Sequence, residues 1–322
     1  MSRLEVVPFA DEHLEAAAAL LAARHARQRG AEPLLSPRYE DPAAARKELE
    51  RVWRGEAASG AAGLRDGRLV GYLVGARREH PVWGENTWVE AAGHAAEEAE
   101  DVRDLYGLAA ARWVDEGRPR HWAVVPAHDT ALLDAWWRVG FGQQHAHGIR
   151  EVPAEVEVRV PGGYEIRAPR EDEIEQLIEL DLTLPEHQQR APVFGGLGLP
   201  TREESREEWL KTLAGDEETI LIGAHEGRPV ACWAYVDVTH SNEHRGLVRP
   251  DHACFLGFAA TLPEARGSGI GVALTQAGLA WAAEQGYPTM LTDWRVTNLL
   301  ASRFWPQRGF RTSFLRLYRH IP

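Results

Sequence analysis

The spacing of apolar residues changes from strand-like to helical within residues 254–286. Cys254 to Leu262 is an almost continuous apolar segment, which predicts a buried strand. From residue 270 onward the apolar positions recur at helical spacing, and Gly286 then supplies a left-handed stop. The residues of this helical stripe are Ile270, Leu274, Ala277, Gly278 and Trp281. The pattern predicts a strand, a short turn and an amphipathic helix.

Strand and helix patterns alternate along the rest of the chain. Thr219 to Ala224 and Val230 to Val238 flank a Glu-Gly-Arg-Pro turn, which predicts a β-hairpin. Pro288 to Trp294 predicts a further strand. Apolar stripes at helical spacing also lie near residues 14–21 and 174–182. This alternation predicts an α/β fold.

The turn before the 270–285 helix is Arg266-Gly267-Ser268-Gly269-Ile270-Gly271. A glycine-rich turn at a helix N-terminus presents backbone N–H groups and the positive end of the helix dipole, and this combination binds phosphate. Glycine is required because a Cβ would hold a pyrophosphate away from the backbone. A P-loop needs a lysine here, and Lys47 and Lys211 lie elsewhere. A dinucleotide fingerprint belongs early in a βαβ domain, whereas this turn comes late in the chain.

The pattern Arg/Gln-x-x-Gly-x-Gly/Ala in this turn resembles the coenzyme A pyrophosphate loop of the GNAT superfamily of acyl-CoA N-acyltransferases. The superfamily continues with a strand and with a helix of the form Asn-x-x-Ala, two aromatic residues and Gly-Phe. The matching residues here are Asn298, Ala301, Phe304, Trp305, Gly309 and Phe310. With the upstream hairpin, the resemblance covers about residues 164–322. It implies a mixed, mostly antiparallel sheet flanked by helices.

The first half of the chain repeats the second. The turn at residues 66–70 aligns with residues 226–230, which we call the hairpin alignment. Further along, Gly140-Phe141 aligns with Gly309-Phe310, which we call the Gly-Phe alignment. An internal repeat of this length implies two copies of one domain. Aligned residues lie 160 positions apart in the hairpin alignment and 169 positions apart in the Gly-Phe alignment. The second copy therefore contains nine additional residues between these two places.

These alignments predict two tandem GNAT-like α/β domains. We expect a first domain at residues 1–153 and a second at residues 164–322, with residues 154–163 as a linker or an extra strand. The nine additional residues of the second copy are expected at about residues 239–251. Such a tandem arrangement resembles that of mycothiol synthase, in which one half works.

The first copy differs from the second at the glycine-rich turn. In that place it has Glu97-Glu98-Ala99-Glu100-Asp101-Val102, with four carboxylates and no glycine. These residues would repel a pyrophosphate and deny it the backbone. In the Gly-Phe alignment, Asp129 of the first copy aligns with Asn298 of the second. We therefore predict a degenerate first domain without coenzyme A, which either packs on its partner or shapes the acceptor site.

Composition and charge narrow the class of protein. A length of 322 residues suits two domains, and the net charge of −12 disfavours nucleic acid as a partner. The two cysteines, Cys232 and Cys254, give no disulfide framework, which favours a reducing cytosol. No apolar signal region begins the chain and no apolar run reaches the length of a membrane span. We expect a cytoplasmic protein without a membrane partner.

The resemblance implies that acetyl-CoA is the co-substrate and indicates where it binds. In GNAT proteins a backbone N–H of the strand before the loop holds the thioester carbonyl. Asn298 would meet the pantetheine arm or cap its helix, and one residue could do both. The expected cofactor-binding residues are Phe258, Ala259, Ala260, Thr261, Arg266, Gly267, Ser268, Gly269, Ile270, Gly271, Asn298, Phe304 and Trp305.

The departing thiolate needs support, and here the sequence departs from the superfamily. A tyrosine is usual where Trp305 stands, and an indole N–H is not a practical proton source. Either the thiolate leaves with hydrogen-bond help alone, or Ser302, one turn earlier on the same helix, supplies the proton. Simple packing beside the cofactor is the other interpretation of Trp305.

The general base is less well specified. GNAT proteins often carry a carboxylate on the strand before the loop, where this chain has Phe255 and Leu256. The candidates in the neighbouring hairpin and loop are Asp237, His240, His244, Asp251 and His252, of which we select Asp251 and His252. The spacing of these histidines with Cys254 resembles a zinc site only distantly, and no metal is expected.

Taken together, these patterns predict an N-acetyltransferase that moves an acetyl group from acetyl-CoA to a primary amine of a small molecule. The active site is expected in the C-terminal domain. A thiol-sugar amine and an aminoglycoside are equally open as acceptors, and the oligomeric state is open. The alternative is a non-catalytic acyl-CoA-binding or sensory protein, which Trp305 and the missing carboxylate on the strand both motivate.

Overall fold

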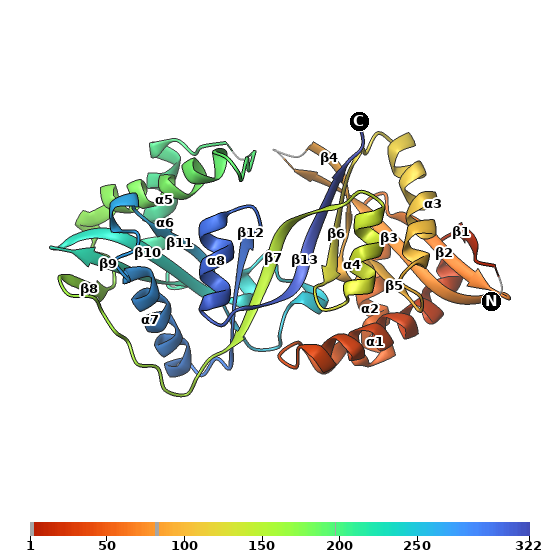
Figure 1. The fold of residues 1–322 in the computed structure, drawn as a ribbon, viewed down its shortest axis with the longest axis horizontal. Coiled ribbons are helices and arrows are strands. Elements are labelled where there is room, and N and C mark those ends of the chain that lie inside the picture. The colour runs from red at the N-terminus through yellow and green to blue at the C-terminus, as the bar shows by residue number, and fades with distance from the viewer. Residues whose placement is uncertain (1–2, 81–83, 197) are drawn as a thin grey trace. The chain divides into compact units, whose positions relative to one another are not determined.

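The structure is a computed structural model that describes residues 3–80, 84–196 and 198–322. These residues divide into two compact units (Figure 1). Unit 1 contains Met1–His147, Arg245–Asp251 and Thr312–Pro322, and unit 2 contains Gly148–His244 and His252–Arg311. Each unit is therefore assembled from segments that lie far apart in the sequence.

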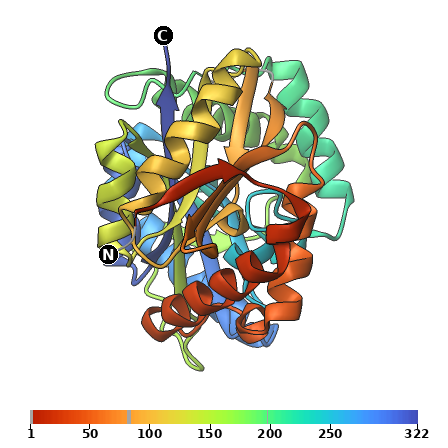
Figure 2. The same ribbon diagram turned by 90° about the vertical axis from the view of Figure 1, so that its right-hand side faces the viewer.

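Unit 1 is built on a sheet with the strand order β1-β2-β3-β4-β6-β13, and β5 pairs beside β3. Within its described residues, only β4 and β6 pair in parallel. Figure 2 turns this unit toward the viewer, with β1 as the red arrow. Its strands are β1 (Glu5–Pro8), β2 (Ser59–Arg65), β3 (Arg68–His80), β4 (Gly84–Val89), β5 (His94–Ala96), β6 (Arg120–Pro126) and β13 (Arg311–His320). Its helices are η1 (Asp11–His13), α1 (Leu14–Ala31), η2 (Pro37–Glu40), α2 (Pro42–Trp53), η3 (Ala91–Gly93), α3 (Asp101–Asp115), α4 (Thr130–Arg138) and η6 (Gly246–Val248).

Unit 2 has the strand order β12-β11-β10-β9-β8, and again a parallel pair, β11 with β12. Its strands are β8 (Tyr164–Arg167), β9 (Glu218–His225), β10 (Arg228–Asp237), β11 (Cys254–Thr261) and β12 (Thr289–Arg295). Its helices are η4 (Glu171–Glu173), α5 (Ile174–Gln189), α6 (Arg202–Ala214), η5 (Val238–His240), η7 (Pro263–Ala265), α7 (Ile270–Glu284) and α8 (Leu299–Gln307). The prediction of mixed, mostly antiparallel sheets flanked by helices is confirmed.

The two copies match element by element. α3 and α7, β6 and β12, and α4 and α8 are all related by the Gly-Phe alignment found in the sequence. The bounds agree to the residue for each pair: α4 begins at Thr130 and α8 at Leu299. The same local sequence signals therefore start and stop the same helix in each copy.

The last strand of the chain belongs to unit 1. β13 pairs antiparallel with β6, from Phe314 opposite Pro126 to His320 opposite Arg120. Phe314 and Leu317 are buried there. The strand β7 (Gly142–Glu151), which ends the first copy, is divided between the units after His147. The last strand of the first copy, β7, thus has residues in unit 2, and the last strand of the second copy, β13, has residues in unit 1.

Part of the segment in which the additional residues of the second copy are expected, 239–251, belongs to unit 1. Arg245–Asp251 belong to that unit, where Leu247 and Val248 are buried. Gly246 has a φ of 56°, and a Cβ there would overlap the side chain of Glu48 on α2. Residues 154–163 contain neither helix nor strand. The predicted domain bounds at 153 and 164 stay a prediction beside these contact-based units.

In unit 2, helices cover both faces of the sheet. α5 and α6 pack on the face that carries Cys232 and Ala234 of β10, with Leu177 and Trp209 in the same buried cluster. α7 packs on the opposite face, where the hydroxyl of the buried Tyr235 donates to the Leu274 carbonyl at 3.1 Å. Figure 1 shows α5 and α6 on one side of these strands and α7 on the other.

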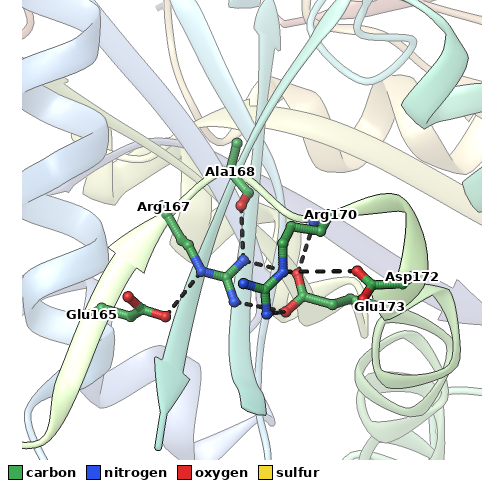
Figure 3. A network of polar contacts seen from close by, with 6 residues as sticks. All are labelled: Glu165, Arg167, Ala168, Arg170, Asp172 and Glu173. Atoms are coloured by element: carbon green, nitrogen blue, oxygen red, sulfur yellow. Dashed lines mark hydrogen bonds and ion pairs between the residues drawn. The ribbon is translucent and has the colours of Figure 1, made fainter. Parts of the chain in front are cut away.

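A charged network fixes the start of α5 to β8 (Figure 3). The buried Glu173 accepts two hydrogen bonds from Arg167, at 2.6 and 2.8 Å, and one from the Arg170 backbone at 2.8 Å. Arg170 adds a side-chain contact at 2.9 Å. Mainly the Arg167 hydrogen bonds, and then the other contacts, lower the pKa of Glu173 to about 2, although burial opposes them. The network holds α5 in register with the sheet.

Two further observations concern the whole chain. No described helix is long and apolar enough to cross a membrane. Cys232 and Cys254 are free and buried, and burial raises the pKa of the Cys254 thiol to about 12.

Candidate functional site

The glycine-rich turn lies between η7 and α7 in unit 2. Gly267 and Gly269 have φ values of 81° and 94°, a left-handed region that only glycine enters without strain. Ser268 closes the turn, since its N–H bonds the Ala265 carbonyl at 3.3 Å and its hydroxyl oxygen accepts from Ile270 N–H at 3.3 Å. Arg266 is exposed and its Nε donates to the Thr261 carbonyl at 3.2 Å. The local sequence thus dictates the turn's shape.

The N-terminus of α7 lacks a side-chain cap. Its N-cap residue is Gly269, which has no side chain to cap the helix, and of the first N–H groups that of Ile270 bonds the Ser268 hydroxyl. By contrast, α8 is capped by Asn298, whose Oδ1 accepts from Leu300 N–H at 3.1 Å and Ala301 N–H at 3.3 Å. The first N–H groups of an α-helix have no partner within the helix. At α7 the N–H groups of Gly271 and Val272 and the helix dipole are available to an anion.

The parallel strands β11 and β12 separate next to this turn. Within the described residues they pair at Cys254–Met290, Phe255–Leu291 and Leu256–Thr292 and no further. Gly257 is the extra residue of a β-bulge, because Leu256 faces Tyr235 and Phe258 faces Ala234 on β10. Gly257 is exposed. Backbone groups after Leu256 are therefore not committed to β12, and we call this region the strand divergence (residues 257–261 of β11 and 293–295 of β12).

The predicted strand residues lie along the divergence. Phe258 turns its ring into the α5–α6 core, 6.1 Å from Trp209, so its side chain serves packing. Ala259, Ala260 and Thr261 pair with Trp233, Cys232 and Ala231 of β10. They lie beyond the last pair of β11 with β12 at Leu256–Thr292.

Asn298 combines its cap with a contact that the sequence did not indicate. Besides the two backbone N–H groups, its Oδ1 lies 3.1 Å from Nε2 of His187 on α5. Since Oδ1 is an acceptor, His187 must carry its proton on Nε2. The side-chain oxygen Oδ1 of Asn298 thus accepts from three donors. The side-chain NH2 group is therefore the part of Asn298 that a ligand can use.

Aromatic residues of β10 and α8 lie beside the start of α7. Trp305 is buried, with ring centroids 4.9 Å from Phe304, 5.6 Å from Phe310 and 6.5 Å from Trp233. A Cβ at Gly271 would lie 3.3 Å from Trp233 and 3.7 Å from Phe304. The indole nitrogen of Trp233 is buried with no hydrogen-bond partner in the described part of the chain. A cradle that a Cβ would fill and an orphaned donor both fit a bound coenzyme.

The two residues proposed to support the thiolate occupy one helix. Ser302 is half-buried on α8, and its N–H donates to the Asn298 carbonyl at 2.8 Å. Trp305 follows three residues later inside the aromatic cluster. Trp305 packs inside this cluster, and the support that Trp305 and Ser302 would give to the departing thiolate stays a prediction.

Asp251 and His252 lie at the amino-terminal end of β11. Both are exposed, and the His252 ring lies 4.9 Å from that of Tyr287. Asp251 falls in unit 1 and His252 in unit 2. Their assignment as the base stays a prediction.

The other loop candidates have structural partners. Burial raises the pKa of Asp237, but hydrogen bonds from Thr239 and Tyr287 outweigh it and lower the pKa. His240 lies 3.4 Å from Glu217. His244 contacts Ser241 through Nδ1 at 2.9 Å and Phe255 with a ring distance of 4.6 Å. No group of three or more described His, Cys, Asp or Glu residues could hold a metal ion.

Sequence reasoning missed four residues at the divergence: Gly257, His187, Asp293 and Arg295. Asp293 carried a usable signal, because it is a charged residue that follows the buried segment 289–292 of its strand. Arg295 is 9% exposed, and its Nε donates to Gln188 of α5 at 3.1 Å. His187 lies 111 residues from Asn298, so no local pattern could have paired them.

The corresponding region of unit 1 is closed by its own side chains. His94 Nε2 lies 2.9 Å from the Val124 carbonyl of β6, directly after the last β4–β6 pair at Val89–Ala123. Arg24 of α1 donates to the His94 carbonyl at 2.6 Å and the Ala91 carbonyl at 2.5 Å. Burial lowers the pKa of His94 to about 3 and that of Arg24 to about 10. A neutral histidine therefore bridges the gap between the strands.

Unit 2 has smaller or different groups at the same places. His94 pairs with Leu73 as Ala259 pairs with Trp233, so Ala259 is the counterpart of His94. In the hairpin alignment Leu184 replaces Arg24, and in the Gly-Phe alignment Asp293 replaces Val124. Only unit 1 thus carries the Arg24–His94 bridge.

The N-terminus of α3 in unit 1 is occupied by carboxylates. Asp101 is buried and forms two hydrogen bonds with Arg65, at 2.6 and 2.7 Å. Glu97 pairs with Arg68, and Glu100 with Arg138 at 2.9 Å. In unit 1, carboxylates thus occupy the place at which the N-terminus of α7 in unit 2 presents backbone N–H groups.

Comparisons with known proteins agree with this geometry. A model of the family described as acetyltransferase (GNAT) family matches residues 183–310. Among curated proteins no relative matches the chain.

Several solved structures share the fold. A GCN5-related N-acetyltransferase from Sphaerobacter thermophilus has a TM-score of 0.58 and 15% identity, over 99% of this chain and 96% of that one. A glucosamine N-acetyltransferase region of a fungal multi-domain β-N-acetylglucosaminidase has a TM-score of 0.55 and 14% identity, over 99% of this chain and 38% of that one. A tandem GNAT protein of the clavulanic acid pathway has a TM-score of 0.49 and 17% identity, over 99% and 98% of the two chains. At these identities the likeness to the first two structures concerns the fold.

Proposed function

We propose that unit 2 binds acetyl-CoA and transfers its acetyl group to the primary amine of a small molecule, since residues 183–310 match the model of the acetyltransferase (GNAT) family. The family match and the fold support an acyl-CoA-dependent N-acyltransferase in general. The acetyl group, the amine and the place of the site in unit 2 are the proposed part.

The observation that carries the proposal is the uncapped N-terminus of α7 beside the strand divergence. The pyrophosphate would accept hydrogen bonds from the backbone of the turn at 266–271, where Gly267 and Gly269 hold left-handed conformations. Unit 1 has carboxylates at this place and a bridged divergence. This contrast supports one acetyl-CoA site per chain, in unit 2.

The pantetheine arm would lie along the strand divergence. There Asn298 offers its NH2 group to an amide carbonyl, because its own oxygen already has three donors. The bulged Gly257 brings an exposed backbone segment next to the last pair of β11 and β12. Backbone donors at this point would polarise the thioester carbonyl and stabilise the oxyanion of the tetrahedral intermediate.

Transfer then requires a neutral amine and a thiolate that can leave. The amine nitrogen attacks the thioester carbonyl carbon, the C–S bond breaks, and coenzyme A departs as a thiolate that takes up a proton. We propose Ser302 as the donor of that proton and keep Asp251 and His252 as the predicted base. Trp305 would pack against the arm without donating.

A release assay tests this proposal. Free coenzyme A is detected with a thiol reagent while acetyl-CoA is offered with a panel of amines, and the products are identified by mass spectrometry. We expect acetyl-CoA-dependent release with at least one amine. Tight binding of acetyl-CoA without turnover on any amine would instead support a non-catalytic acyl-CoA sensor.

A further inference from the structure

One histidine of unit 2 has its ring oriented by a contact at the strand divergence. Nε2 of His187, on α5, lies 3.1 Å from Oδ1 of Asn298. The side-chain amide of Asn298 cannot be turned around, because Oδ1 also accepts from the backbone N–H groups of Leu300 and Ala301. Nε2 of His187 must therefore carry a proton. In the neutral ring the basic lone pair is then on Nδ1.

Within the described part of the chain, Nδ1 of His187 has no hydrogen-bond partner. The side chain is half-buried. The fully buried His94 and His121 of unit 1 are different, since each of them bonds through both ring nitrogens. Buried polar groups that serve the core are satisfied in this way. The ring of His187 instead has one nitrogen held by Asn298 and one that can accept a proton.

Two side-chain hydrogen bonds hold the end of α5 at the strand divergence. His187 bonds Asn298, which precedes α8, and Gln188 accepts from Arg295 at the end of β12 at 3.1 Å. α5 covers one face of the sheet, and α7, which follows the glycine-rich turn, covers the other (Figure 1). A coenzyme bound at that turn reaches the divergence from the α7 face. The α5 face, where His187 lies, is then left to the acceptor.

From this arrangement, and resting on the proposed function, we propose that His187 is the general base that takes a proton from the acceptor's ammonium group. Asn298 is its positioning residue, because the contact with Oδ1 keeps the proton on Nε2 and leaves Nδ1 to react. An imidazole suits this step, since histidine is the side chain that ordinarily changes its charge between about pH 5 and 8. The NH2 group of Asn298 remains for the pantetheine arm.

The reaction balances in protons and bonds. Nδ1 of His187 takes one proton from the ammonium group and passes it to solvent. The neutral nitrogen attacks the thioester carbonyl carbon, a C–N bond forms, and the C–S bond breaks. The proton that the attacking nitrogen then loses balances the one that the coenzyme A thiolate takes up. The products are the N-acetyl amine, coenzyme A and one proton in solution.

The two bases predicted from the sequence lie at the opposite end of β11. Asp251 and His252 precede Cys254, where the strand begins. At about 3.3 Å per residue, Cys254 is already about 10 Å from Gly257, the first residue of the divergence. His187 is held at the divergence by its own contact. It therefore takes the place of Asp251 and His252 in the inferred reaction.

At the aligned positions, unit 1 has a different pair of residues. In the hairpin alignment Arg27 replaces His187, and in the Gly-Phe alignment Asp129 replaces Asn298. An arginine stays protonated in proteins and cannot act as a base. The His187–Asn298 pair thus occurs in the copy to which we assign acetyl-CoA.

His187→Gln tests this inference, because the glutamine NH2 group can still donate to Asn298 while no basic nitrogen remains. Acetyl-CoA is offered with the best amine of the release assay. At pH 7 we expect kcat/KM to fall by about 10²-fold or more, with an unchanged Kd for acetyl-CoA and an unchanged melting temperature. The loss should shrink as the pH rises toward the pKa of the amine itself, about 10.4 for a lysine-like amine, because the amine then needs no base.

Two further measurements separate a base from a structural residue. His225→Gln, at an exposed histidine of β9, is the matched control and should leave kcat/KM and its dependence on pH unchanged. Imidazole added to His187→Ala should restore part of the lost turnover at pH 7, because it can enter the space of the missing ring and accept the proton.

The outcomes distinguish this inference from the proposed function. Turnover that His187→Gln leaves unchanged would overturn the inference and leave the acetyltransferase assignment intact. A pH-dependent loss in Asp251→Asn or His252→Gln, without one in His187→Gln, would return the role to the base predicted from the sequence. An equal loss at every pH, without rescue by imidazole, would make His187 a structural residue. Binding of acetyl-CoA by the wild type without turnover of any amine would overturn both proposals.

Discussion

Replacing Gly269 by glutamate tests the phosphate-binding turn directly. A Cβ at this position meets only Pro161, at 3.4 Å, so the side chain has room. The φ of 94° costs a non-glycine residue about 1–2 kcal/mol. A carboxylate at the N-terminus of α7 interacts favourably with the helix dipole and offsets part of this strain. We therefore expect Gly269→Glu to fold.

The effect on acetyl-CoA should be far larger. The new carboxylate occupies the place of the pyrophosphate, and at least two charge-assisted hydrogen bonds of about 1.5–3 kcal/mol each are lost. The sum of about 3–6 kcal/mol corresponds to a rise in Kd of more than about 100-fold. Charge repulsion adds to this loss.

Isothermal titration calorimetry with acetyl-CoA measures the effect, and a thermal melt reports the fold. Gly286→Glu is the matched control, because Gly286 has a φ of 79° with no atom within 4 Å and follows the far end of the same helix. It should melt below the wild type and still bind acetyl-CoA. If Gly269→Glu is folded and binds acetyl-CoA as tightly as the wild type, the turn does not hold the pyrophosphate.

Four other predictions follow from the two units. Calorimetry should give one acetyl-CoA per chain, because carboxylates and His94 fill the equivalent region of unit 1, and a stoichiometry of two would contradict this. The pKa of Glu173 is about 2 when folded, below its ordinary value, so its stabilisation of up to about 3 kcal/mol is complete above about pH 4.5 and lost as the pH falls toward 2; Glu173→Gln should flatten this dependence in denaturant titrations. Ser302→Ala should lower kcat by about 10²-fold without changing the Kd for acetyl-CoA, whereas Trp305→Phe should keep most turnover; the reverse result would make the indole the group that supports the thiolate. Deleting residues 312–322 should unfold unit 1, which loses the partner strand of β6, and hydrogen exchange should then show lost protection in residues 3–80.

Local sequence was enough to predict the elements of the proposed coenzyme site. The turn at 266–271 needs glycine for its backbone conformation, and the stripe of α7 follows from its own residues. Asn298 caps α8 through contacts within three residues. Each of these features depends on neighbours along the chain, so the pattern and the structure agree.

The contacts that α5 makes with Asn298 and with the end of β12 could not be predicted in the same way. His187 meets Asn298 across 111 residues, and Arg295 meets Gln188 across 107. Asp293 gains its position only because β12 stops pairing with β11 one residue earlier. Such contacts depend on how helices and strands pack, and neither composition nor spacing encodes them.

What the sequence by itself determined is the repeated α/β domain, its helix bounds and the asymmetry between a glycine-rich turn and a carboxylate-rich one. Only the tertiary structure decided which unit contains the last strand of each copy. β7 and β13 follow the same Gly-Phe signal, so either strand suits the open edge of either sheet. Strand pairing is a long-range choice among edges with similar patterns, which local propensity cannot make. The assignment of β13 to β6 and of Arg245–Asp251 to unit 1 is therefore visible only in the folded chain.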